Sequence, residues 1–256
     1  MYPILYRLDG LTFYAYGVFL TLGMVVAGGL VILRIREEGL PIPLDRVMAL
    51  FFYALLSAVV GSRALFVLIN LDSFRVNPPA IFNLWEGGLV FYGGLLLAIG
   101  ISVGYMRWHR LPFWKLFDLV SPSLALGLFF GRIGCFFAGC CYGKETSLPW
   151  AVIFRDPHSL ARLNVPLHPT QLFDAANGLF LFLFLLWMEK KKSFDGQIFF
   201  LFLLLYSGTR FFIEFLRGDP RGFLLKGFVS TSQGIGILLI IFSFFMLFLL
   251  RRRCGR

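Results

Sequence analysis

Long apolar runs alternate with short polar segments along nearly the whole chain. A helix needs about 20 residues to cross the hydrocarbon of a membrane, and seven runs reach that length. They lie at about 13–33, 47–69, 88–106, 116–141, 170–188, 196–216 and 228–250. The pattern predicts an all-α, polytopic membrane protein with seven transmembrane helices, built as a single domain over residues 1–256.

Composition supports this prediction. Of the 256 residues, 58% are hydrophobic and 15% are charged, whereas a soluble domain averages about 45–50% apolar and about 25% charged residues. The net charge of +10 is divided among short loops and forms no single basic face, so nucleic-acid binding is not expected.

Basic residues also predict the orientation. Those after the first, third, fifth and seventh runs number thirteen, against eight in the other connections. Since positive loops stay in the cytoplasm, the N-terminus is expected outside and the C-terminus in the cytoplasm.

Three basic residues remain inside the predicted spans: Arg63, Arg132 and Arg210. A charge at the centre of a membrane helix costs about 2.5–3.5 kcal/mol on insertion scales, so such residues face the bundle interior or a water-filled cavity. Few acidic residues lie deep in the spans with them. We therefore expect a bound anion to complete the charge balance.

Arg210 belongs to a stripe of polar residues spaced 4, 4 and 3, which share one helix face: Tyr206, Arg210, Glu214 and Arg217. The stripe is either a structural Arg210–Glu214 pair or an anion site. In the second case, Glu214 orients Arg210 or handles a proton.

Arg132 adjoins small residues spaced 4, 3 and 4, a pattern that lets another helix approach closely: Gly127, Gly131, Gly134 and Ala138. Its planar guanidinium group suits bidentate binding of phosphate. Arg63 is either a third phosphate contact or a structural tie to a backbone carbonyl, and the sequence does not separate the two.

Three cysteines follow Arg132: Cys135, Cys140 and Cys141. Their C-x4-C-C spacing, with no histidine nearby, is a poor metal pattern, and neither a metal nor a cofactor is expected. Arg132 could activate a nucleophilic or redox thiol. The favoured interpretation is small packing residues in a helix interface.

Two further stretches carry polar residues at span ends. Tyr92 stands between two Gly-Gly pairs, where glycine permits irregular backbone or close approach of a ligand. The run His168-Pro-Thr-Gln opens the fifth span. His168 fits a structural role at the helix start as well as it fits catalysis.

Several of these motifs, in this order, resemble the bacterial prolipoprotein diacylglyceryl transferase family over nearly the whole chain. The most specific is GRIG at 131–134, continuing through Gly139 to Gly143. It is accompanied by Tyr16-Gly17, Tyr92-Gly93-Gly94, the His-Pro-Thr-Gln run and the Tyr206, Arg210, Glu214 stripe.

The resemblance implies an inner-membrane enzyme that transfers the diacylglyceryl group of phosphatidylglycerol to the lipobox cysteine of a preprolipoprotein, releasing glycerol phosphate. It implies that Arg132 and Arg210 bind the phosphate, that Glu214 supports them and that Tyr16 helps to form the site. The expected catalytic residues are Arg210, Glu214, Tyr92 and Tyr16; the expected headgroup residues are Arg132, Arg63, Gly134, Gly143, Tyr206 and His168.

The chain departs from the family pattern at three positions. Tyr92 stands where the family commonly has histidine, Cys135 where it has asparagine and Cys140 where it has glutamate. The group that deprotonates the acceptor thiol is therefore open, with Glu214, His168 or a thiolate delivered by the substrate as candidates. Two alternatives remain: a paralogue using another phospholipid or acceptor, and a non-enzymatic lipid or anion carrier.

Overall fold

A computed structural model describes residues 1–8, 11–39, 42–83, 87–219, 223–224 and 229–254. The chain forms two compact units, which are described separately. Unit 1 comprises Met1–Glu37 and Trp114–Arg256, and unit 2 comprises Glu38–Phe113.

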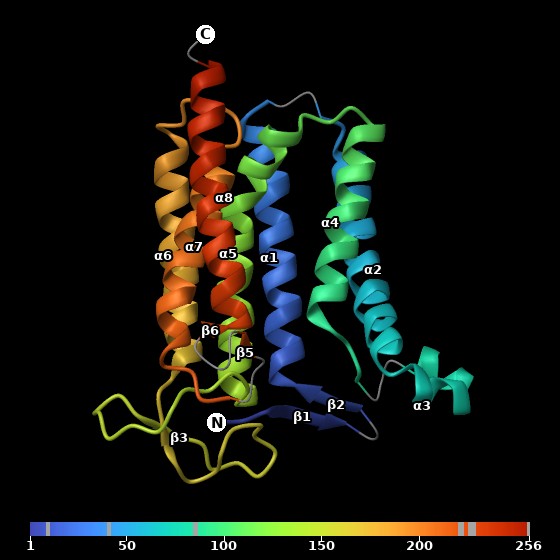
Figure 1. Cartoon of the computed structure of the whole chain (residues 1–256), viewed down its shortest axis with the longest axis vertical. Coiled ribbons are helices and arrows are strands. Elements are labelled where there is room, and N and C mark those ends of the chain that lie inside the picture. Colours follow the sequence, from blue (N-terminus) through green and yellow to red (C-terminus); the bar gives the residue numbers. More distant parts are fainter. Residues whose placement is uncertain (9–10, 40–41, 84–86, 220–222, 225–228, 255–256) are drawn as a thin grey trace. The chain divides into compact units, whose positions relative to one another are not determined.

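Unit 1 is built mainly of five long helices, joined by loops that carry short strands (Figure 1). The helices are α1 (Ala15–Glu37), α5 (Phe113–Ala138), α6 (Thr170–Glu189), α7 (Gln197–Glu214) and α8 (Thr231–Cys254). Three antiparallel strand pairs complete it: β1 (Ile4–Leu8) with β2 (Leu11–Tyr14), β3 (Val152–Ile153) with β4 (Pro166–Leu167), and β5 (Phe223–Leu224) with β6 (Val229–Ser230). These strand pairs were not predicted.

The prediction of a helical, multi-pass membrane protein is confirmed. Six helices of the described residues are long and apolar enough to cross a membrane: α1, α5, α6, α7 and α8 of unit 1, and α2 (Leu44–Ile69) of unit 2. The third predicted span, 88–106, forms the 18-residue α4 (Phe91–Trp108), which is not one of these six. The count of seven spans therefore stays a prediction.

Close helix contacts in unit 1 are made at glycines. A Cβ at Gly134 would lie 3.1 Å from the Cβ of Phe19 on α1, and one at Gly178 of α6 would lie 3.0 Å from the backbone nitrogen of Phe129 on α5. An added Cβ at Gly127 or Gly131 meets no such neighbour in unit 1. The predicted small-residue stripe is thus a close contact at Gly134 and not along its whole length.

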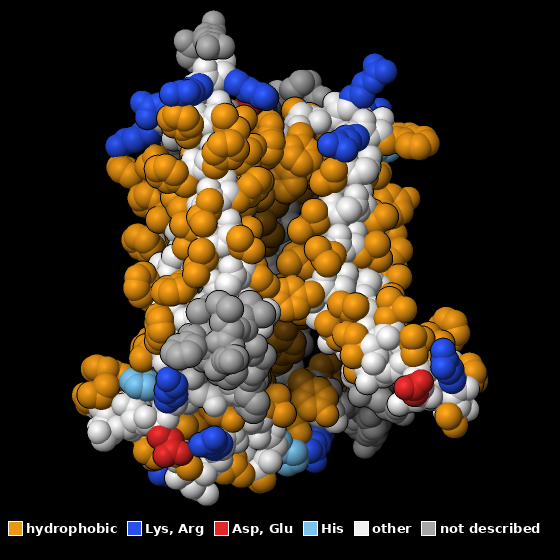
Figure 2. All heavy atoms as spheres, in the orientation of Figure 1, with side chains coloured by type: hydrophobic (Ala, Val, Ile, Leu, Met, Phe, Trp, Pro, Cys, Tyr) orange, Lys and Arg blue, Asp and Glu red, His pale blue; other side chains and the backbone are white. Residues whose placement is uncertain are grey.

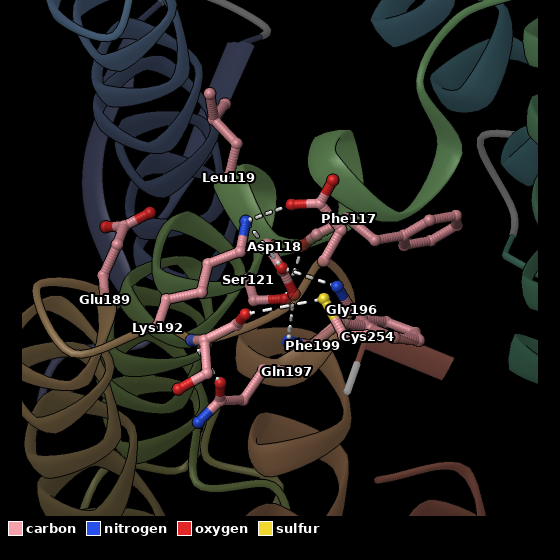
Figure 3. A network of polar contacts seen from close by, with 12 residues as sticks. Phe117, Asp118, Leu119, Ser121, Glu189, Lys192, Gly196, Gln197, Phe199 and Cys254 are labelled. Carbon is pink, nitrogen blue, oxygen red and sulfur yellow. Dashed lines mark hydrogen bonds and ion pairs between the residues drawn. The ribbon is translucent and has the colours of Figure 1, made fainter. Parts of the chain in front are cut away.

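At the opposite end of α5 from Gly134, a buried carboxylate joins α5 to the start of α7 (Figure 3). Asp118 accepts hydrogen bonds from the backbone N–H groups of Gly196 and Phe199, at 2.7 and 2.8 Å, and lies 3.0 Å from Nζ of Lys192. The first N–H groups of a helix lack partners within the helix, and a negative charge there is favourable. Asp118 therefore caps α7 from a neighbouring helix.

Helix α8 has the surface expected of a membrane span. Its exposed side chains are large and apolar, while Arg251, Arg252 and Arg253 gather in its last turn (Figure 2). Among the exposed apolar residues are Ile237, Leu238, Ile241, Phe242, Phe244, Phe245 and Phe248. Lipid is the solvent that suits such a face, and the arginines mark its polar boundary.

Unit 2 consists of α2, α3 (Leu71–Val76), the short 3-10 helix η1 (Pro78–Phe82) and α4. Helices α2 and α4 pack at glycines: a Cβ on Gly93 would lie 2.3 Å from the carbonyl oxygen of Gly61, and one on Gly61 would lie 2.4 Å from that of Gly93. The glycine pair after Tyr92 therefore allows two backbones to meet.

Candidate functional site: a buried charge cluster

The predicted anion-binding residues of unit 1 gather where α5 and α7 end and α6 begins (Figure 1). Nη1 of Arg132 lies 3.1 Å from Oδ2 of Asp174, and Nη1 of Arg217 lies 3.8 Å from the same oxygen. The Asp174 side chain is 3% exposed. One buried carboxylate thus lies between two guanidinium groups that come from different parts of the sequence.

Arg217 is held by a second carboxylate. Its Nε and Nη2 donate to the two carboxylate oxygens of Asp219, at 2.9 and 3.0 Å, in the bidentate geometry typical of arginine. Burial is the largest single influence and lowers the pKa of Arg217, but the hydrogen bonds and charges of Asp219 and Cys141 together raise the net pKa. The guanidinium therefore stays charged, while its buried Nη1 has no hydrogen-bond partner among the described residues.

Arg210 and Glu214 form an ion pair on α7, with Nη2 of Arg210 2.5 Å from Oε2 of Glu214. Both side chains are largely buried, at 11% and 4% exposed. The pair agrees with the structural interpretation of the stripe. However, Nη1 of Arg210 is buried and makes no hydrogen bond within the described part of the chain. That unused donor is what an added anionic oxygen would need.

Tyr206, one turn before Arg210, lies near Arg132 and interacts with it electrostatically. Its ring stacks on Phe202 at a centroid distance of 5.8 Å. Tyr16 is the second residue of α1, where Gly134 of α5 packs against its backbone, and it is 42% exposed. The structure therefore brings Tyr206, Arg132 and Gly134 of the predicted site together, with Tyr16 beside them.

Gly143 is fixed by its backbone. Its N–H donates to the carbonyl of His168 at 3.0 Å, and it forms an isolated antiparallel bridge with Arg217. An added Cβ would lie 2.5 Å from the Cβ of His168 and 2.9 Å from the carbonyl oxygen of Leu216. Glycine is required here because the segments after α5, before α6 and after α7 meet at this point.

His168 is engaged on its ring as well. Its Nδ1 accepts a hydrogen bond from Nε1 of Trp150 at 3.3 Å, and its backbone N–H donates to the carbonyl of Lys144. These contacts favour the structural role at the helix start.

Arg63, in unit 2, uses its guanidinium differently. A guanidinium has five N–H donors, and those of Arg63 donate to five carbonyls at 2.6–3.2 Å: Ile81, Gly87, Gly88, Ala80 and Asn83. Gly87 and Gly88 have φ of +84° and +76°, the left-handed region that glycine tolerates. Of the two roles left open by the sequence, these contacts support the tie to carbonyls.

Tyr92 lies in the first turn of α4 and is 41% exposed. Its ring contacts that of Phe91 at a centroid distance of 5.6 Å. Within unit 2 it therefore presents its side chain outward, while the glycines that follow it face α2.

Sequence reasoning gave no role to Asp174, Arg217 or Asp219. Arg217 ends the predicted stripe, so its spacing placed it on that helix face, whereas Asp174 lies in the first turns of α6 after the His-Pro-Thr-Gln run. The signal that links them is the contact between segments far apart in sequence, which spacing does not contain.

Together these features define a multi-pass membrane protein with a buried, arginine-rich site at one end of its helices. The prolipoprotein diacylglyceryl transferase family model matches residues 3–249, and the chain belongs to that family. Relatives named phosphatidylglycerol–prolipoprotein diacylglyceryl transferase occur in Clostridium tetani, 36% identical over 96% of both chains, and in Geobacter sulfurreducens, 33% identical over 98% of this chain and 96% of the relative. A Clostridium perfringens relative, given the same name with the number 2, is 38% identical over 93% of this chain and 91% of its own.

Proposed function

We propose that this protein is a transferase that moves the diacylglyceryl group of phosphatidylglycerol to the lipobox cysteine thiol of preprolipoproteins. Glycerol phosphate is the other product. The observation that carries the proposal is the buried guanidinium cluster of Arg132, Arg210 and Arg217, in which Nη1 of Arg210 and Nη1 of Arg217 lack hydrogen-bond partners among the described residues. Membership of the family and the names of the relatives supply the reaction.

The reaction is an alkyl transfer. The acceptor sulfur forms a bond to the glyceryl carbon of the lipid while the bond from that carbon to the phosphate oxygen breaks. Negative charge develops on the leaving phosphate, and preorganised donors in a site of low dielectric stabilise such charge most. Arg132 and Arg210 hold that phosphate, and Glu214 keeps Arg210 in position through its ion pair.

The remaining predicted residues have four roles. Tyr16 and Tyr206 line the lipid site near Arg132. Tyr92, at the start of α4, is a further catalytic residue. Gly134, Gly143 and His168 shape the site through the backbone, and Arg63 stabilises the loop of unit 2. Both units form one transferase domain over residues 1–256.

The location follows from the charge pattern. Seven helices, α4 included, cross the bacterial inner membrane with the N-terminus outside and the C-terminus in the cytoplasm. The charge cluster then lies toward the outer surface, where the acceptor cysteine of a preprolipoprotein is presented. Phosphatidylglycerol enters laterally from the lipid.

Complementation tests the proposal. A strain depleted of its own diacylglyceryl transferase should regain lipidation of a lipobox reporter when this chain is expressed, and the modified cysteine should carry a diacylglyceryl thioether by mass analysis. A product with a different lipid group would indicate the paralogous reaction instead. Movement of lipid without any thioether would indicate a carrier.

A further inference from the structure

Three thiols gather at the end of α5 although their sequence spacing is unlike that of metal motifs. The sulfur atoms of Cys135, Cys140 and Cys141 all lie within 4.8 Å of one another, and none of the three is in a disulfide. Cys135 is in the last turn of α5, whereas Cys140 and Cys141 lie in the turn after it.

The turn that brings the thiols together is held by α6. Two of its residues have positive φ, Gly139 at +78° and Cys141 at +63°. For cysteine this conformation is strained and needs support from its surroundings. The support comes from the first residues of α6: the hydroxyl of Thr170 donates to the carbonyl of Cys141, and the amide of Gln171 to that of Cys140, both at 2.8 Å.

Thr170 and Gln171 are fully buried, at 0% exposed. Because two buried side chains fix the backbone of both cysteines, the convergence of the sulfurs is built into the fold. If Cys141 served only for packing, glycine would fit its left-handed conformation with less strain.

Positive charge adjoins the thiols. Arg217 interacts electrostatically with Cys141, and Arg132 does so with both Cys141 and Cys135. Cysteine binds metal ions as the thiolate, the form that a neighbouring positive charge favours.

The dimensions suit a soft metal ion. Zinc–sulfur bonds of about 2.3 Å place ligand sulfurs about 4 Å apart, within the 4.8 Å limit of this cluster. Thiolate ligands select soft or borderline ions such as Zn²⁺ and Cu⁺. Three protein ligands, instead of the four of a structural zinc site, leave one coordination position for a substrate.

We propose that Cys135, Cys140 and Cys141 bind a thiophilic metal ion of the Zn²⁺ class, whose open position takes the thiol of the acceptor cysteine. The use of that position rests on the proposed function, while the metal site does not. The other candidate bases in unit 1 are engaged: Glu214 is paired with Arg210, and Nδ1 of His168 accepts from Trp150. The metal site thus supplies the missing means of deprotonating the acceptor.

The step balances without an oxidant. The metal held by the three cysteines would supply the deprotonation: a thiol bound at the open position would lose its S–H proton to water. The sulfur electron pair forms the bond to the glyceryl carbon. The carbon–oxygen bond breaks with its electron pair on the phosphate oxygen, and glycerol phosphate leaves.

Metal content tests the site independently of activity. The full chain in detergent is reduced, loaded with ZnCl₂, freed of excess metal and analysed for zinc per chain. Wild type and the matched control Cys254→Ser should retain about one equivalent, as one site requires, and each of Cys135→Ser, Cys140→Ser and Cys141→Ser should lose most of it. Wild type that retains no more zinc than the triple serine variant, with both helical by circular dichroism, overturns the proposal.

Cobalt tests the open position without relying on any variant of the enzyme. In Co²⁺-loaded wild type, a lipobox peptide should strengthen the thiolate-to-cobalt absorption, and the same peptide with Cys→Ser should not. Equal spectra with both peptides would overturn the coordination of the acceptor.

Transfer assays separate the two proposals. If zinc-free enzyme or the triple serine variant transfers lipid at the wild-type rate, the catalytic metal is wrong and the proposed function stands. If zinc-loaded wild type binds the metal but transfers nothing, the proposed function fails and the metal site stands.

Discussion

Arg132 and Asp174 form an ion pair of 3.1 Å between the last turns of α5 and the first turns of α6. The carboxylate that receives Arg132 also lies 3.8 Å from Arg217. Asp174 is therefore a buried acid that holds Arg132, a phosphate-binding candidate, and Arg217 in place. We therefore expect Asp174 to matter for stability and transfer as much as either arginine.

Asp174→Asn should lower stability and transfer together. The change keeps the shape of the side chain but leaves the guanidinium of Arg132 without its carboxylate, at a cost of about 3 kcal/mol, while Arg217 keeps Asp219. Thermal unfolding in detergent and the rate of lipid transfer measure the two effects. Asp72→Asn is the matched control, because Asp72 pairs with Arg75 at 3.7 Å with its side chain fully exposed. Equal thermal stability and equal transfer rates of the two variants would show that Asp174 has no special role in the site.

Arg210→Ala and Arg132→Ala should each reduce transfer about 100-fold or more, the usual loss when one donor to developing charge is removed. Arg210→Lys should be faster than Arg210→Ala but slower than wild type, because lysine restores the positive charge without the bidentate guanidinium. Arg162→Ala serves as control, since Arg162 forms only an exposed pair with Glu145. Normal lipidation of a reporter by Arg210→Ala would contradict the phosphate assignment.

Arg63→Ala should destabilise the protein without a specific effect on lipid binding. The substitution removes five hydrogen bonds to part-buried carbonyls, each with a net contribution of about 0.5–1.5 kcal/mol. We expect a lower midpoint of thermal unfolding and an unchanged KM for phosphatidylglycerol per folded molecule. A variant with normal stability and a raised KM would restore Arg63 to the headgroup site.

Gly143→Ala should impair both folding and transfer. Its Cβ would meet backbone atoms of His168 and Leu216 at 2.7 and 2.9 Å, so the three segments that meet there must separate. Gly29→Ala, in α1, is the comparison, because a Cβ there meets nothing within 4 Å. Purification yield and melting temperature distinguish the two, and a Gly143→Ala protein as stable as Gly29→Ala would show that the contact is not needed.

Hydropathy predicted most of the fold because every helix that crosses the lipid needs a run of about 20 apolar residues. Each of the seven apolar runs forms a helix, with ends shifted by a few residues. The arginines were recognised for the same reason: a charge in an apolar run is costly wherever it lies in the sequence.

The residues that pair with these arginines were less predictable, because segments far apart in the sequence supply them. Arg63 was placed in a span, but its carbonyl partners come from a loop whose path no spacing rule gives. The cysteines illustrate the same limit. The C-x4-C-C spacing argued against a metal, yet positive φ at Gly139 and Cys141, fixed by Thr170 and Gln171, closes the three sulfurs together.

The mass of an acceptor peptide shows whether this chain transfers the diacylglyceryl group. The purified chain is incubated with phosphatidylglycerol vesicles and a lipobox peptide, and the peptide is analysed by mass spectrometry. The account predicts a diacylglyceryl thioether on the peptide cysteine, formed by wild type and absent with Arg210→Ala. An unmodified peptide after incubation with folded wild type, under conditions in which a relative such as the Clostridium tetani enzyme modifies it, would contradict the account.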